Sequence, residues 1–171
     1  MEYILREISK ADLPVINKWR NDKEVIDLLG NNFFYIAYEV DENWYNDYLQ
    51  NRSKAIRLAI VDNELNITIG TVQLTNIHPI NKSAEFSIMI GDKNYWSKGA
   101  GYFATNAMLE HGFKNLNLHR IYLTVLANNN RATQLYKKAG FQYEGTLHDA
   151  IFKNGEYLNL ICMAIIKNNN S

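Results

Sequence analysis

The chain has 171 residues, of which 47% are hydrophobic and 21% charged, with nine glycines, two prolines and one cysteine. This length and composition predict one globular domain, and they exclude disordered, collagen-like and low-complexity proteins. The formal net charge is zero, so nucleic acid is not an expected partner. No apolar run reaches the roughly 18 residues that cross a membrane, and the start MEYILREISK is unlike a secretory signal. We therefore expect a cytoplasmic protein without a membrane partner.

The pattern of apolar residues predicts both helices and strands along the whole chain. Ser9 and Asp12 form a capping-box pattern at the first helix, and Asp41 is the expected N-cap of the third. This mixture predicts an α/β fold with one mixed sheet and helices on both sides, built by residues 1–167 and followed by a polar tail at 168–171. The predicted strands span residues 3–8, 56–61, 67–75, 84–90, 119–126, 141–151 and 157–166, and the predicted helices span 9–20, 23–29, 42–50, 102–114 and 131–138.

A glycine-rich loop between a predicted strand and the longest predicted helix is the first candidate binding site. It contains Lys98, Gly99 and Gly101. Glycines allow a ligand to approach the backbone, and N–H groups at a helix N-terminus bind phosphate oxygens, so we expect a di- or polyphosphate here. The segment Gly99–Ala104 also fits the dinucleotide pattern G-x-G-x-x-A. However, its first glycine follows the strand by eight residues, and the next strand ends without an acid for a ribose, which argues against a dinucleotide.

A second motif follows some thirty residues later. The segment Asn129–Phe141 reads NNRATQLYKKAGF, and together with WSKGAG at 96–101 it resembles the GNAT superfamily of acetyl-CoA-dependent N-acyltransferases. The family's phosphate motif Q/R-x-x-G-x-G/A has Trp96 at its first position here. WRND at 19–22 and the segment 144–163 resemble the branch of ribosomal-protein N-terminal, spermidine and nucleotide-aminosugar acetyltransferases. The resemblance implies an α/β (α+β) fold with a single mixed, mostly antiparallel central sheet of about seven strands.

The resemblance implies acetyl transfer from acetyl-CoA to a primary amine, without a covalent enzyme intermediate. It places Tyr136 at the sulfur as general acid, because a phenol and a thiol have pKa values close enough for proton transfer. Glu85 is the candidate base, since a carboxylate at the start of a buried strand is costly unless it is used or paired. Surface pairing of Glu85 remains an alternative.

The donor site implied by the resemblance involves three segments. Strand residues would contact the donor through their main chain, the glycine loop would hold the pyrophosphate, and the last helix would contact CoA from the other side. These candidates are Ser87, Ile88, Met89 and Ile90; Trp96, Ser97, Lys98, Gly99, Ala100, Gly101 and Tyr102; and Asn129, Arg131 and Lys138.

The acceptor is less well defined by the sequence. The first 52 residues carry ten acidic and six basic side chains, an excess that suits a cationic amine such as a polyamine or a peptide N-terminus. Arg20 could instead meet the phosphates of a nucleotide aminosugar, and Trp19 could belong to the core. The candidate acceptor-binding residues are Trp19, Arg20, Tyr38, Glu39 and Asp41.

Other functions are weaker hypotheses. The four histidines show no metal-ligand spacing, so no metal is expected, and Cys162 lies in an apolar run typical of a core. A small-molecule acetyltransferase is the favoured interpretation. A protein N-terminal acetyltransferase and a non-catalytic acyl-CoA-binding protein are the alternatives, and a homodimer is compatible with each.

Overall fold

The computed structural model describes residues 2–167, and the predicted polar tail at 168–171 lies outside this range. It contains seven strands and five α-helices, with short 3-10 turns before α1 and α4. The strands are β1 (Tyr3–Glu7), β2 (Ile56–Asp62), β3 (Ile67–His78), β4 (Ser83–Ile90), β5 (Arg120–Leu126), β6 (Gln142–Lys153) and β7 (Glu156–Ile166). The helices are α1 (Leu13–Arg20), α2 (Lys23–Asp27), α3 (Tyr38–Gln50), α4 (Ala100–Glu110) and α5 (Asn130–Lys138).

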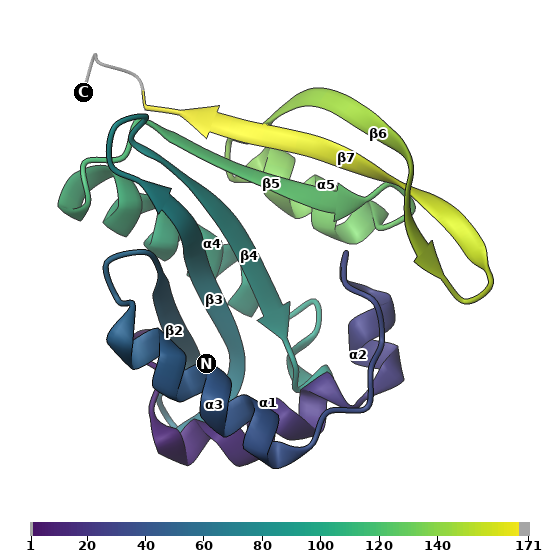
Figure 1. The fold of residues 1–171 in the computed structure, drawn as a ribbon. Helices are drawn as coiled ribbons and strands as arrows, with labels where there is room; N and C mark the ends of the chain where they lie inside the picture. The colour runs from purple at the N-terminus through teal and green to yellow at the C-terminus, as the bar shows by residue number, and fades with distance from the viewer. Residues whose placement is uncertain (1, 168–171) are drawn as a thin grey trace.

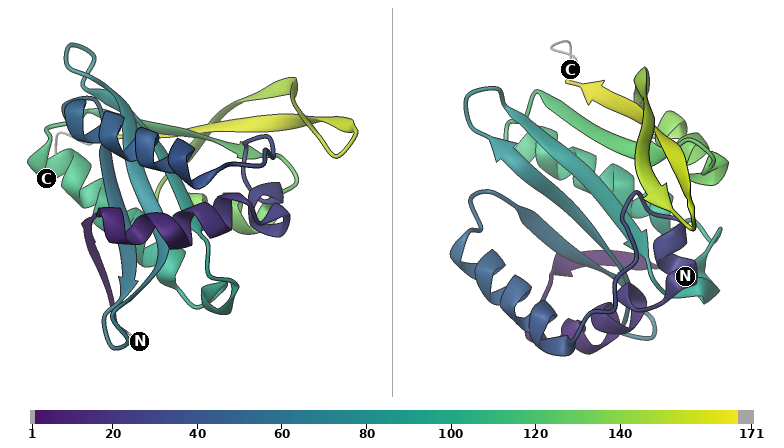
Figure 2. Two further views of the ribbon diagram at one scale, coloured as in Figure 1. Left: turned by 60° about the horizontal axis from the view of Figure 1, so that its bottom comes forward. Right: turned by 45° about the vertical axis from the view of Figure 1, so that its right-hand side comes forward.

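The strands form a single sheet in the order β1-β2-β3-β4-β5-β7-β6. Every neighbouring pair is antiparallel except β4 and β5, which are parallel. Helices α1 and α3 cover one face of the sheet, while α4 and α5 cover the other (Figures 1 and 2). The predicted mixed, mostly antiparallel sheet with helices on both faces is therefore confirmed. Among residues 2–167, no helix has the length and apolar character needed to cross a membrane.

The main core lies between the central strands and the helices α4 and α5. Phe86 of β4, Tyr136 of α5 and Phe141 meet there, with ring centroids 5.8–6.0 Å apart. Tyr136 lies edge-on to both phenylalanine rings, a favourable arrangement for aromatic pairs. The aromatic ring of the expected catalytic tyrosine is thus a core side chain, and its position is fixed by packing.

Two helices begin earlier than expected. Helix α3 starts at Tyr38 after Ala37, so Asp41 lies within its first turn and is not the N-cap. Asp41 is fully buried, with 0% exposure, and accepts hydrogen bonds from Arg20 and from Asn17. An aspartate before a helical pattern resembles a cap, but here a tertiary ion pair determines its place. Helix α4 starts at Ala100 and continues into a π-helical turn at 111–115.

The parallel contact between β4 and β5 is short. The strands pair only at Ser83 with Arg120, Ala84 with Ile121 and Glu85 with Tyr122. Beyond this three-pair seam β4 continues to Ile90 and β5 to Leu126, and the two strands diverge (Figure 1). The backbone of both strands is therefore unpaired on the sides that face each other across the opening.

Candidate active site

A cleft of about 660 Å³ occupies the opening between β4 and β5. Residues 86–90 of β4 form one wall and residues 124–126 of β5 form the other, so the expected donor-binding strand residues do line it. The glycine loop lies at one end, and residues of α1, α2 and α3 lie over the sheet face at the other. We call these ends the donor half (residues 96–102 and 129–136) and the acceptor half (residues 16–57, 71 and 73). The volume is typical of a small-molecule site.

The glycine loop exposes its backbone to the cleft. Gly99 has a φ of 88° and precedes the first turn of α4, where a Cβ atom would have no heavy atom within 4 Å. A Cβ at Gly101 would meet Leu135 Cδ1 at 3.0 Å, so this glycine allows α4 to pack closely on α5. The first N–H groups of a helix have no partner within the helix, and its dipole favours an anion there. The loop can therefore bind phosphate oxygens through its backbone.

Aromatic side chains hold this loop on the sheet. The Trp96 indole N–H donates to the Ile90 carbonyl at 2.8 Å, and the Tyr3 hydroxyl donates to the Lys98 carbonyl at 3.1 Å. The Tyr95 hydroxyl donates to Asp62 at 2.7 Å, and this hydrogen bond, with burial, raises the pKa of Tyr95 to about 12. The loop is consequently fixed in shape before any ligand binds.

Three cations surround the donor half, each lying over an aromatic ring. The Arg131 guanidinium is 5.1 Å from the centre of the Trp96 ring, and the Lys138 ammonium is 4.4 Å from that of Tyr102. The Lys98 ammonium lies 5.9 Å from the Tyr95 ring. Arg131 lines the cleft itself, whereas Lys98, Ala100 and Lys138 lie outside its lining. This charge and the exposed backbone N–H groups fit a diphosphate.

Asn129 lines the donor half and acts there as a cap. Its Oδ1 accepts from the Ala132 backbone N–H at 3.1 Å, and its Nδ2 donates to the Leu28 carbonyl at 2.9 Å. Both ends of the side chain are thus used within the protein. The structure places Asn129 at the expected position and assigns it to holding α5 against the segment after α2.

Tyr136 lies on the wall of the cleft with only 8% of its surface exposed. Within residues 2–167, its hydroxyl group has no hydrogen-bond partner. Burial raises the pKa of Tyr136 to about 12, so the phenol stays protonated at neutral pH. The site therefore presents an unused proton donor to whatever fills the cleft.

Glu85 lies at the last residue pair of the seam, where the strands begin to separate. It lines the cleft, and its Oε2 accepts a hydrogen bond from Asn76 Nδ2 at 2.8 Å. It forms no ion pair with a cationic side chain in the described part of the chain. The alternative of a surface salt bridge is therefore not what the structure shows, and the carboxylate is available to an amine.

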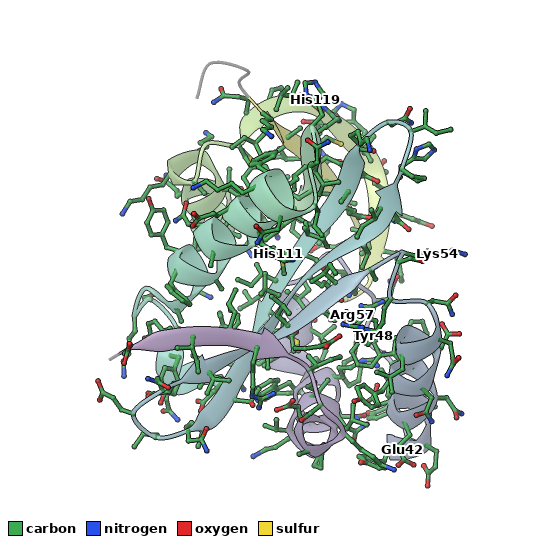
Figure 3. All side chains as sticks on the ribbon, turned by 90° about the vertical axis from the view of Figure 1, so that its left-hand side faces the viewer. Glu42, Tyr48, Lys54, Arg57, His111 and His119 are labelled. Atoms are coloured by element: carbon green, nitrogen blue, oxygen red, sulfur yellow. The ribbon has the colours of Figure 1, made fainter. Side chains whose placement is uncertain are left out.

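The acceptor half contains side chains that the sequence analysis did not identify. Arg57 donates to Gln73, and Gln73 donates to the Ser87 hydroxyl at 2.7 Å, which makes a polar row across β2, β3 and β4. The Arg57 guanidinium also lies over the ring of Trp44 at 4.8 Å and over that of Tyr48 at 5.7 Å. Figure 3 labels Arg57 and Tyr48, which lie close together. Arg57, Gln73 and Ser87 share a row only because of the strand register, which no local sequence pattern reveals.

Only one of the five expected acceptor-binding residues lines the cleft, namely Arg20. Trp19 is buried against Gly91, where any Cβ atom would overlap the indole ring. Tyr38 and Glu39 lie in the first turn of α3 outside the lining, and Asp41 is buried in its ion pair with Arg20. The expected acidic selectors are therefore not brought into the cleft. Within residues 2–167, no group of three or more His, Cys, Asp or Glu residues could hold a metal ion.

Comparison with known proteins gives consistent matches. A family model described as Acetyltransferase (GNAT) domain matches residues 3–142. Spermidine N(1)-acetyltransferase of Vibrio cholerae is 33% identical over 165 residues, which cover 95% of this chain and 92% of that protein. The enzyme of the same name from Escherichia coli K12 is 30% identical over 163 residues, covering 95% and 85%. A crystal structure of the Vibrio cholerae spermidine N-acetyltransferase in complex with CoA and spermine has a TM-score of 0.90 at 31% identity, covering 96% and 95% of the two chains.

Proposed function

This chain belongs to the GNAT family of acetyl-CoA-dependent N-acetyltransferases, and from that premise we propose that its acceptor is a primary amine of a polyamine. Two relatives that cover nearly the whole chain are named spermidine N(1)-acetyltransferases. A similar solved structure contains CoA and spermine. These names support the small-molecule hypothesis over a protein N-terminal acceptor.

The observation that carries the proposal is the hydroxyl of the largely buried Tyr136, which has no partner within residues 2–167 and lies on the wall of a cleft that begins at an anion-binding loop. A CoA thioester bound there would supply the activated acetyl group. The loop backbone and Arg131 would hold the phosphates of CoA. The unpaired backbone of β4 would hold the pantetheine arm, which joins these phosphates to the thioester. Both reactants would then be positioned in one water-poor space, which accounts for much of the rate of such reactions.

The proton transfers follow from the two side chains at this place. An amine attacks only when it is neutral, so Glu85 would accept the proton that the ammonium loses, directly or through water. The C–N bond then forms as the C–S bond breaks, and the departing sulfur needs a proton. Tyr136, which its raised pKa keeps protonated, would donate that proton, and the second proton that the nitrogen loses on becoming an amide would return the tyrosinate to a phenol, directly or through water.

One carboxylate at the seam, beside the acceptor half, supports a cationic acceptor. Glu85 is the only carboxylate among the described residues that line the cleft; the Arg20 charge is balanced by Asp41, whereas Arg57 bonds to Gln73 and forms no ion pair within residues 2–167. One ammonium end of a polyamine would therefore meet Glu85. This assigns amine recognition to the sheet surface and not to the helix residues expected from the sequence.

The test is release of free CoA from acetyl-CoA, measured with spermidine, with a nucleotide aminosugar and with short peptides that begin with Ser or Ala. The proposal predicts release with spermidine and none with the peptides. Release with peptides alone would replace it by a protein N-terminal acetyltransferase. Binding of acetyl-CoA without turnover of any amine would favour the non-catalytic alternative.

A further inference from the structure

Lys153 is a buried lysine at the tip of the hairpin formed by β6 and β7. It is only 5% exposed, although it directly precedes the turn residues Asn154 and Gly155. Its ammonium donates to the backbone carbonyl oxygens of Ile26, Leu29 and Asn31 at 2.8, 2.9 and 2.6 Å. An ammonium has three N–H donors, so all of them are used. No carboxylate of residues 2–167 forms an ion pair with Lys153.

This arrangement is costly unless it has a compensating role. Burial of an ammonium is unfavourable, and here it lowers the pKa of Lys153. The Ile26 carbonyl also accepts from the Leu29 N–H at 3.0 Å, whereas the Leu29 and Asn31 carbonyls receive no backbone N–H within residues 2–167, and the partial negative charge of all three favours a cation. The lysine therefore supplies the hydrogen bonds that Leu29 and Asn31 cannot make locally, and it adds a second donor to the Ile26 carbonyl.

The segment held in this way forms part of the active site. Residues 28–31, which we call the wall segment, all line the cleft. A second contact holds the same segment, because Asn129 donates to the Leu28 carbonyl at 2.9 Å. A third contact links the hairpin to Asn32, the residue that follows the wall segment. Asn32 donates to the Phe152 carbonyl at 2.5 Å. The wall segment thus takes its position from the hairpin and from α5.

We infer that Lys153 is a positioning residue for acetyl transfer, which holds the wall segment in place within the acceptor half so that the amine is aligned in the cleft. The inference rests on the proposed function. The ammonium fixes the Leu29 and Asn31 carbonyl groups of the wall segment; without it they would turn toward water, and the wall segment would move with them. Displacements of about 1 Å at a substrate-positioning segment reduce rates by up to roughly 100-fold.

The test compares Lys153→Met, which keeps the aliphatic chain and removes the three donors, with Lys153→Arg, which keeps a cationic donor. For Lys153→Met we expect the KM for spermidine to rise about tenfold, while the KM for acetyl-CoA changes by less than about twofold. Lys153→Arg should recover most of the loss. Lys114→Met is the matched control, because Lys114 is an exposed lysine that pairs with Glu110 far along α4.

Hydrogen exchange provides a readout that does not depend on activity. In Lys153→Met, amides 28–31 should exchange at least about tenfold faster, while those of β3 and β4 remain as in the wild type. Lys153→Gln gives a graded, neutral variant if Lys153→Met does not fold. Unchanged amine KM and unchanged exchange would overturn the inference, as would equal losses for both substrates in Lys153→Met and Lys153→Arg. If wild-type protein acetylates no amine, the proposed function fails, and the exchange data still decide whether Lys153 holds the wall segment.

Discussion

Replacing Tyr136 by phenylalanine removes one hydroxyl group and leaves the ring in place. The ring contacts with Phe86 and Phe141 at 6.0 and 5.8 Å are unaffected. Because the hydroxyl has no partner within residues 2–167, its loss breaks no hydrogen bond of the described structure. We therefore expect the free energy of unfolding to stay within about 0.5 kcal/mol of the wild-type value.

The effect on catalysis should be much larger. Burial raises the pKa of Tyr136 to about 12, two units above its usual value, which favours the neutral phenol over the phenolate by roughly 3 kcal/mol. The phenol therefore stays protonated through the neutral range, and the departing thiolate, whose pKa the same water-poor cleft would also raise, would take its proton. Loss of a positioned general acid reduces kcat by about 100-fold or more. The dissociation constant of acetyl-CoA should be unchanged.

The measurement combines steady-state CoA release, acetyl-CoA titration and thermal unfolding of wild type and Tyr136→Phe. Tyr157→Phe is the control, because Tyr157 is an exposed tyrosine on β7. A kcat within twofold of wild type would refute the assignment of Tyr136 as acid. A fall in kcat accompanied by a large loss of stability would show that the hydroxyl has a structural role instead.

Three further predictions concern other parts of the structure. Glu85→Gln should lower kcat/KM for the amine about tenfold and leave the KM for acetyl-CoA unchanged, and an unaltered kcat/KM would exclude Glu85 as the base. Arg131→Met should raise the KM of acetyl-CoA several-fold but not that of acetyl-pantetheine, which lacks the phosphates; equal effects on both would contradict a phosphate contact. Asp12→Asn should cost about 3 kcal/mol at pH 7 in a denaturant titration. Burial alone would raise the pKa of Asp12, but hydrogen bonds from Arg6 and Thr68 lower it well below its usual range. Because the folded-state pKa is lowered, this contribution is present above about pH 4 and is lost as the pH falls further, so the two proteins should converge in acid.

Much of the fold could be predicted from local signals. The strand positions follow from alternating or continuous apolar runs, and the Ser9–Asp12 capping box is present, with the Ser9 N–H donating to Asp12 at 2.8 Å. The start of α3 could not be predicted, because Asp41 resembles a cap and its true partner, Arg20, lies 21 residues away. Strand β3 reaches His78 past an irregularity in register after Thr75, and β6 reaches Lys153 because Phe152 and Lys153 still pair regularly with β7 up to the turn.

The donor half was more predictable than the acceptor half. A glycine loop and a helix cap are local features, and the motif places Tyr136 and Arg131 on the same α5. Acceptor-half residues such as Arg57 and Gln73 come together through strand register, and their sequence neighbours carry no signal of it. Lys153 is the clearest example: KNG looks like an exposed turn, yet the ammonium is buried under backbone from residues more than 120 positions away.

The three-pair seam between β4 and β5 also divides the chain in folding terms. On one side, β2, β3 and β4 follow one another as a meander, and on the other, β6 and β7 form a hairpin, so each part is dominated by contacts close in sequence. Such local pairing forms early, whereas the seam joins segments 37 residues apart through only three pairs. The candidate active site would then lie at the boundary between two early-forming folding units. Partial unfolding would begin at this boundary, by separation of the two units.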